Sequence, residues 1–147
     1  MPSIALVTLQ FLALAALVWP WGAPAWNAWA FVALAVAALL MGWTIAHNRP
    51  SNFSVLPKPR ANAKLVTSGP YALVRHPMYL ALSVFGIGCA LGWNTPVHWG
   101  AVALLAIVLD RKSRAEERHL RERFADYAAY AQRTPRLLPR HGRTATR

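Results

Sequence analysis

Two long stretches of this chain carry no charged side chain, and they limit the possible fold more than any other feature. No Lys, Arg, Asp or Glu occurs in residues 1–46 or in residues 77–109. Apolar segments lie within them at 4–19, 29–46, 78–93 and 97–109. A helix needs about 20 apolar residues to cross a bilayer comfortably, so each segment is a short span. The pattern predicts an integral membrane protein.

Short turn sequences divide each stretch into two helices. Residues 20–24 read Pro-Trp-Gly-Ala-Pro and residues 92–96 read Gly-Trp-Asn-Thr-Pro, which are typical helix-breaking turns. We therefore predict an all-α fold of about four transmembrane helices in two hairpins, with a cytoplasmic C-terminal helical extension. At 147 residues the chain is one domain. Its expected parts are an N-terminal hairpin (1–46), a basic loop (47–77), a second hairpin with the C-terminal helix (78–139) and a disordered tail (140–147).

The basic residues predict how the hairpins are oriented. All sixteen lie outside the apolar stretches, five in the middle loop and eleven after residue 110. Basic loops stay on the cytoplasmic side, so we expect both termini and the loop there, in a bacterial inner membrane. The hairpin tips would carry an aromatic belt of Trp19, Trp21, Trp26, Trp29, Trp93 and Trp99. The net charge of +11 could also indicate nucleic acid, but no nucleic-acid-binding motif is recognisable, so we expect none.

Some smaller features have structural explanations. Ala23-Pro24-Ala25 resembles a signal-peptide cleavage site, but no Lys or Arg precedes it as a charged n-region would require. Gly88 and Gly92 are four residues apart, which predicts close helix packing within the monomer or between chains. Cys89 is the only cysteine, so no disulfide or cysteine cluster can form, and we expect no metal.

A polar sequence leads into the third apolar segment. Arg75 and His76 precede Pro77, which suits the first turn of a helix. The free amides and partial positive charge of such a helix start can bind an anion. The structural alternative is that Arg75 is a basic anchor, Tyr79 an interfacial aromatic residue, and the basic loop only a contact for anionic lipid.

A second polar sequence follows the fourth apolar segment. Helical periodicity continues past Leu109 and places Leu109, Ser113, Leu120, Phe124, Tyr127 and Ala131 on one stripe. Glu116 and Glu117 lie on the shoulders of this stripe. The predicted hairpin returns them to the membrane face where the sequence Arg75–Tyr79 begins, so a small charged ligand could be held between them. A solvated charged helix face is the alternative reading.

These residues resemble the isoprenylcysteine carboxyl methyltransferase family, and related phospholipid N-methyltransferases share much of the pattern. The resemblance covers roughly residues 65–139. It rests on Gly69-Pro70-Tyr71, Arg75-His76-Pro77-Met78-Tyr79, Glu116-Glu117, Phe124, Tyr127, Tyr130 and Pro135-Arg136-Leu137-Leu138-Pro139.

The resemblance implies an integral membrane enzyme that transfers methyl from S-adenosylmethionine (SAM) to a lipophilic substrate in the bilayer. Counting back from Phe124 favours Glu117 over Glu116 as the cofactor ligand. The implied cofactor contacts are Lys64, Leu65, Val66, Tyr71, His76, Pro77, Met78, Tyr79, Glu116 and Glu117.

The acceptor is less well defined by the resemblance. In the prenylcysteine enzymes an arginine one turn before the glutamate serves the substrate carboxylate, and here that position is Ser113. Arg111 and Arg114 on either side are candidate substrate-binding residues, and Arg114 and His76 are candidate catalytic residues. A carboxylate, a phospholipid amine and a small thiol all stay open as acceptors, as does the oligomeric state. The alternative class is a non-catalytic membrane protein that binds anionic lipid or a partner.

Overall fold

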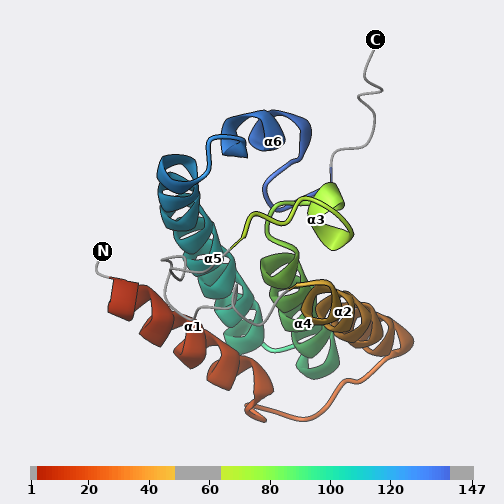
Figure 1. The fold of residues 1–147 in the computed structure, drawn as a ribbon. Coiled ribbons are helices and arrows are strands. Elements are labelled where there is room, and N and C mark those ends of the chain that lie inside the picture. Colours follow the sequence, from red (N-terminus) through yellow and green to blue (C-terminus); the bar gives the residue numbers. More distant parts are fainter. Residues whose placement is uncertain (1–2, 49–63, 140–147) are drawn as a thin grey trace.

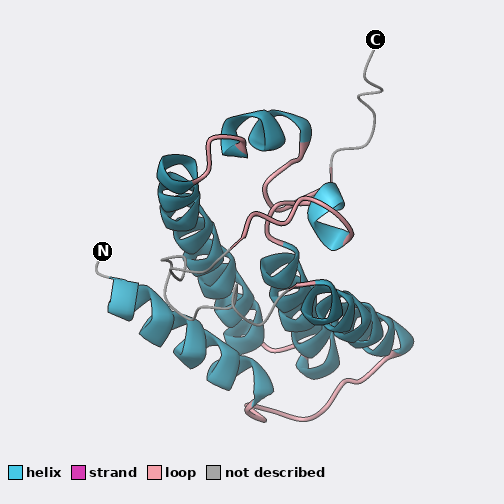
Figure 2. Cartoon of the chain, in the orientation of Figure 1, coloured by secondary structure: helices cyan, strands magenta, loops and turns pink. Residues whose placement is uncertain are grey.

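The computed structural model describes residues 3–48 and 64–139, and all regular secondary structure in these two ranges is helical (Figure 2). The helices are α1 (Ser3–Val18), α2 (Ala28–His47), α3 (Pro70–Leu73), α4 (Pro77–Trp93), α5 (Pro96–Arg123) and α6 (Tyr127–Arg133). The four long helices match the four predicted apolar segments, and the all-α prediction is confirmed. Residues 49–63, about half of the predicted basic loop, and the whole predicted tail lie outside the described residues.

The hairpin of α4 and α5 forms the centre of the bundle. α1 packs against α5, and α2 packs against α4 (Figure 1). Within the described helices, α1 and α2 make no contact with each other, although only residues 19–27 separate them along the chain. The N-terminal pair therefore straddles the second hairpin, with one helix on each side of it. The core lies between α1, α4 and α5 and consists of Ala13, Leu17, Tyr79, Cys89, Ala101, Leu105 and Leu109.

Small residues on α4 allow the helices to approach closely. A Cβ atom on Gly88 would lie 2.9 Å from Cδ2 of Leu34 on α2. One on Gly92 would lie 2.5 Å from the ring of Trp26. The close packing predicted for these two glycines is confirmed within the chain. Cys89, between them, is buried in the core as a small packing residue.

The two hairpin tips are tied together at one end of the bundle. The amide of Ala25 donates to the carbonyl of Gly92 at 2.7 Å, and the side chain of Asn27 donates to the carbonyl of Leu91 at 3.2 Å. Asn27 also caps α2, because its Oδ1 accepts from the amide of Ala30. Trp26 and Trp93 meet edge to face with ring centroids 5.9 Å apart. Tryptophans therefore do gather at this end, as the sequence predicts.

The outer surface of the bundle is strongly apolar. Large side chains on α1 and α2 remain exposed, among them Phe11, Leu12, Phe31, Val32, Val36 and Leu39. Among the described helices, one, Ala28–His47, is both long and apolar enough to cross a membrane by itself, and the apolar helices Ile4–Val18 and Pro77–Trp93 are shorter. An apolar surface of this extent on a helical bundle is expected where lipid covers it.

The C-terminal helix is not continuous, contrary to the stripe predicted through Ala131. α5 ends at Arg123, the chain turns at Phe124–Asp126, and α6 begins at Tyr127. The turn brings α6 to the short helix α3 (Pro70–Leu73), where Tyr130 donates to the carbonyl of Tyr71 at 2.6 Å. A straight helix would carry Tyr130 away from this contact, so the tertiary packing overrides the local periodicity.

Candidate functional site

The site begins at a tight turn that leads into α4. Gly69 has a φ of 59°, in the region that favours glycine. The short helix α3 that follows was not predicted, and it places Tyr71 between two partners. The Tyr71 hydroxyl accepts from the side-chain amide of Asn48 at 2.8 Å, and its carbonyl accepts from Tyr130. Tyr71 thus links α2, α3 and α6 beside the start of α4.

His76 lies between the two glutamates. Its Nδ1 is 3.4 Å from Oε2 of Glu116, and its Nε2 is 3.3 Å from Oε1 of Glu117. An imidazole ring can donate to two carboxylates at once only when both nitrogens are protonated. Burial alone lowers the pKa of His76, but the hydrogen bonds to Glu116 and Glu117 and their charges outweigh it and raise the pKa. The geometry and the electrostatics therefore both indicate an imidazolium.

Tyr79, one turn into α4, extends this cluster. Its ring stacks on His76 with centroids 5.5 Å apart and an interplanar angle of 5°. Its hydroxyl donates a short hydrogen bond to Oε1 of Glu116. Nζ of Lys112 lies 5.5 Å from the centroid of the same ring and donates to Gln10 of α1 at 2.6 Å. The polar cluster thus reaches from α4 to α5 and on to α1.

Arg75 anchors the other side of the cluster. Its Nε and Nη2 lie 2.9 and 2.7 Å from Oε1 of Glu117. Its Nη1 donates to the carbonyls of Ala131 and Thr134 at 2.7 and 2.6 Å. The Arg75 and Glu117 side chains are only 10% and 6% exposed. This buried ion pair fastens the α4 start to α5 and α6.

Glu116 and Glu117 differ in their charged neighbours and in their exposure to solvent. Burial raises the pKa of Glu117, but hydrogen bonds from His76 and Arg75 and their charges outweigh this and lower it to about 2. Its Oε2 also lies 3.4 Å from Nη2 of Arg121. Glu116 is more open, with 21% of its side chain exposed. Burial first, and then the charge of Glu116, raise the pKa of Tyr71 to about 12, so its hydroxyl stays protonated.

The structure brings together most, but not all, of the residues predicted to form the site. His76, Tyr79, Glu116 and Glu117 are joined by hydrogen bonds, ion pairs and ring stacking. Tyr71 lies near enough for the charge of Glu116 to affect its pKa, and Pro77 and Met78 follow His76 in the first turn of α4. Lys64, Leu65 and Val66 lie in the irregular segment before α3, with Lys64 exposed and the other two half-buried. Arg114 pairs with Asp110 at 2.8 Å, and its side chain is 64% exposed. It lines, with Arg111, a separate arginine-rich pocket that shares Glu117 with the cluster.

Sequence reasoning missed three residues of this region. Arg75 stood in the motif Arg75–Tyr79 but was given no site role, although its side chain is only 10% exposed. Lys112 and Gln10 join α5 to α1 next to Tyr79. One signal was present for Gln10, because it is the only amide side chain in a strongly apolar helix. The partners Ala131 and Thr134 of Arg75 gave no signal, since they contribute only backbone carbonyls.

Together the fold and the site define a small helical membrane protein with a histidine–carboxylate cluster at one end of its bundle. The chain belongs to the phospholipid methyltransferase family, whose sequence model matches residues 26–127. The matched range contains α2 through α5 and the whole cluster formed by Tyr71, His76, Tyr79, Glu116 and Glu117. The resemblance drawn from the sequence is thereby confirmed at the level of the family, which is one of membrane methyltransferases.

Three curated proteins are similar to part of this chain, and one of them is named as a methyltransferase. The chain is 40% identical over 83 residues to the cobalt-zinc-cadmium resistance protein CzcN of Cupriavidus metallidurans, covering 55% of this chain and 38% of that protein. It is 33% identical over 85 residues to the nickel-cobalt-cadmium resistance protein NccN of Alcaligenes xylosoxydans xylosoxydans, with the same coverages. It is 32% identical over 80 residues to the protein-S-isoprenylcysteine O-methyltransferase B of Arabidopsis thaliana, covering 52% of this chain and 40% of that protein. The alignments thus span about two fifths of each relative.

Proposed function

We propose that this chain is a SAM-dependent methyltransferase acting on a lipophilic membrane substrate, most like an isoprenylcysteine carboxyl O-methyltransferase. One observation carries the proposal: His76 lies between Glu116 and Glu117 and stacks on Tyr79, in a chain that belongs to a methyltransferase family. Such a cluster has the carboxylates and aromatic faces that a cationic nucleoside-like ligand needs. A buried ion pair from Arg75 to Glu117 holds it in place.

The side chains fit the chemistry of SAM. The half-buried carboxylate of Glu116 can accept from the ammonium group or the ribose hydroxyls, and Tyr71 offers an aromatic face. Bound SAM supplies an electrophilic methyl group on a sulfonium. The amides of Arg75 and His76 already donate to carbonyls of the C-terminal segment, so the first amide of α4 that could meet a carboxylate is that of Met78.

The two glutamates have different parts in this proposal. The residue count from Phe124 favours Glu117 as the cofactor ligand, but we propose Glu116 as the direct ligand, because its side chain is the more exposed of the two. Glu117 is a positioning residue that fixes Arg75 and His76. Methyl transfer requires mainly that donor and acceptor are aligned, which a rigid cluster provides.

The protonation state of His76 affects which methyl acceptor the site can use. An imidazolium between two carboxylates cannot take a proton from an amine, so it favours an acceptor that needs no base, such as a carboxylate or a thiolate. The second candidate is a phospholipid amine, which the description of the matching family favours. In either case Arg111 and Arg114 are the nearest candidates for an anionic group on the acceptor.

The proposed membrane placement follows from the same cluster. Two hairpins would cross the bilayer, with the Trp26 and Trp93 end away from the cytoplasm and the His76 end facing it. The charged half of α5 and the basic C-terminal segment lie at the His76 end, in agreement with the positive-inside rule.

Binding of SAM to the protein purified in detergent tests the site. We expect Glu116→Gln to weaken SAM affinity roughly tenfold or more, since a hydrogen bond to a charged group contributes about 1.5–3 kcal/mol. Glu122→Gln, on the exposed face of the same helix, should leave affinity unchanged. Equal SAM affinities in the two variants would show that Glu116 does not bind SAM. No SAM affinity in any form, with lipid binding abolished by salt, would support the non-catalytic class instead.

Membranes incubated with methyl-labelled SAM test the acceptor. Label released by mild base would identify a methyl ester, as the first candidate requires. Label that stays attached to a lipid amine would identify the phospholipid, and label on sulfur would identify a thiol.

A further inference from the structure

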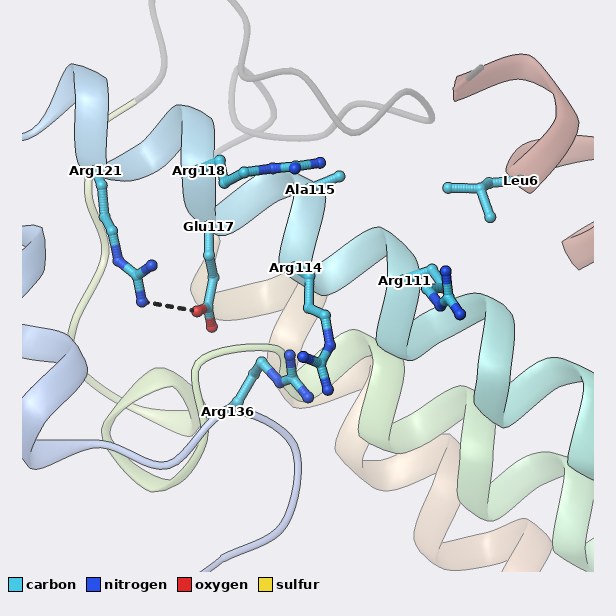
Figure 3. Close-up of a pocket in the computed structure, with 8 residues that line it drawn as sticks. All are labelled: Leu6, Arg111, Arg114, Ala115, Glu117, Arg118, Arg121 and Arg136. Atoms are coloured by element: carbon cyan, nitrogen blue, oxygen red, sulfur yellow. Dashed lines mark hydrogen bonds and ion pairs between the residues drawn. The ribbon is translucent and has the colours of Figure 1, made fainter. Parts of the chain in front are cut away.

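A cavity lined mainly by arginines reaches Glu117, the residue that it shares with the cluster. It has a volume of about 590 Å³, within the roughly 300–1,000 Å³ typical of small-ligand sites. Figure 3 shows arginines along one side of α5, Arg136 facing them from the C-terminal segment, and Leu6 of α1 across the opening. The lining residues are Leu6, Arg111, Arg114, Ala115, Glu117, Arg118, Arg121 and Arg136. We refer to it as the arginine pocket.

The positive charge of the arginine pocket is only partly balanced. Arg114 and Arg136 both pair with Asp110, and Arg121 pairs with Glu117. Arg111 and Arg118 form no ion pair with the described residues. Five guanidinium groups therefore face two carboxylates, one of which also pairs with Arg75. Such a cluster is stabilised by a bound anion, and arginine forks suit phosphate oxygens.

The position of the pocket identifies the kind of anion. The arginines begin two residues after Leu109, where the apolar half of α5 ends, and Leu6 brings the apolar helix α1 to the rim. A ligand there meets guanidinium groups on one side and Leu6 of the apolar helix α1 on the other. A phospholipid offers both a phosphate and an acyl chain, whereas free phosphate offers only the charge.

We propose that the arginine pocket binds the phosphate of an anionic phospholipid of the surrounding bilayer. This binding requires no methyl transfer and rests on the membrane placement proposed above, not on SAM. Two lining residues, Arg111 and Arg114, are also the candidates proposed above for an anionic group on the acceptor. The bound lipid would bridge α1, α5 and the C-terminal segment beside Glu117, through Leu6, Arg118 and Arg136. It would thereby stabilise the packing of α1, α5 and the C-terminal segment next to the cluster.

Binding of a fluorescent phosphatidylglycerol to the full chain in detergent micelles tests the proposal. The variant is Arg111→Gln with Arg118→Gln. The matched control is Arg123→Gln with Arg133→Gln, which removes the same charge from exposed positions outside the pocket. Because each basic residue near an anionic lipid contributes about fivefold, we expect the pocket variant to bind roughly 30-fold more weakly. The control should change binding by about twofold or less, because its arginines line no part of the pocket.

Three results would overturn the proposal. Equal losses in the two double variants would mean general attraction of charge. Equal affinity for phosphatidylcholine would mean that net lipid charge is not recognised. Complete displacement by millimolar inorganic phosphate would identify a free-phosphate site rather than a lipid site. SAM affinity measured on the same samples reports on the proposed function separately.

Discussion

Replacing Glu117 with glutamine tests the buried ion pair that supports the site. Glu117→Gln keeps the size of the side chain but removes the charge that faces Arg75, His76 and Arg121. Arg75 then stays buried with hydrogen bonds to Ala131 and Thr134 and without its counter-ion. We expect a large loss of stability, because an unpaired buried charge is costly.

Two independent routes give the size of this loss. The pKa of Glu117 falls from 4.5 to about 2, and each pKa unit corresponds to about 1.4 kcal/mol, so ionisation of this group stabilises the fold by about 3 kcal/mol at neutral pH. Breaking a buried ion pair costs about 3–5 kcal/mol of stability. Because Arg75 keeps its hydrogen bonds to Ala131 and Thr134, we expect a cost at the lower end of this range. A loss of about 3 kcal/mol lowers the Tm by about 10 °C for a chain of this size.

Thermal unfolding in detergent, followed by tryptophan fluorescence, measures the effect. Glu122→Gln is the control, since Glu122 is exposed on the same helix. Because the folded pKa of Glu117 lies below its ordinary value, its stabilisation is present above pH 4.5 and is lost as the pH falls toward 2. The Tm values of wild type and Glu117→Gln should therefore converge in that range. A Tm for Glu117→Gln within 2 °C of the control at about pH 7 would refute the reasoning.

Two further variants test the packing of α4 and the charge of His76. Gly88→Ala should lower the Tm by several degrees, because its Cβ would lie 2.9 Å from Cδ2 and 3.2 Å from the backbone nitrogen of Leu34; Gly42→Ala, with nothing within 4 Å, should not. The raised pKa of His76 means that its charge stabilises the fold below pH 6.5 and that this stabilisation is lost as the pH rises through the folded pKa. The Tm of wild type should fall with rising pH in that window, and His76→Gln should remove the fall; parallel curves would contradict an imidazolium at this position.

Much of the fold could be predicted because apolar runs and helix breakers act locally. The four long helices follow directly from the uncharged stretches and the Pro- and Gly-rich turns, and Pro77 begins α4 as its ring geometry predicts. The partners of the helices could not be predicted, since nearly uniform apolar surfaces on α1 and α2 do not indicate which neighbour each will contact. The break at Phe124 was missed for a similar reason, because it satisfies tertiary contacts of Tyr130 and Thr134 rather than a local signal.

The residues that meet in the cluster could be predicted, but the position of the Arg75 side chain could not. The hairpin geometry correctly brought His76 and Tyr79 to Glu116 and Glu117. The sequence could not indicate that Arg75 turns inward, because long basic side chains at helix ends usually extend toward water.

The arrangement of the helices has a consequence for how the protein is made. α1 and α2 are synthesised before their main packing partners, α5 and α4. In a nascent chain that ends before α4, neither helix therefore has the partner that it contacts in the described structure. The N-terminal pair can pack only after the later hairpin has been made. Premature termination between α4 and α5 would leave α1 without most of the surface it packs against, even though its own sequence is complete.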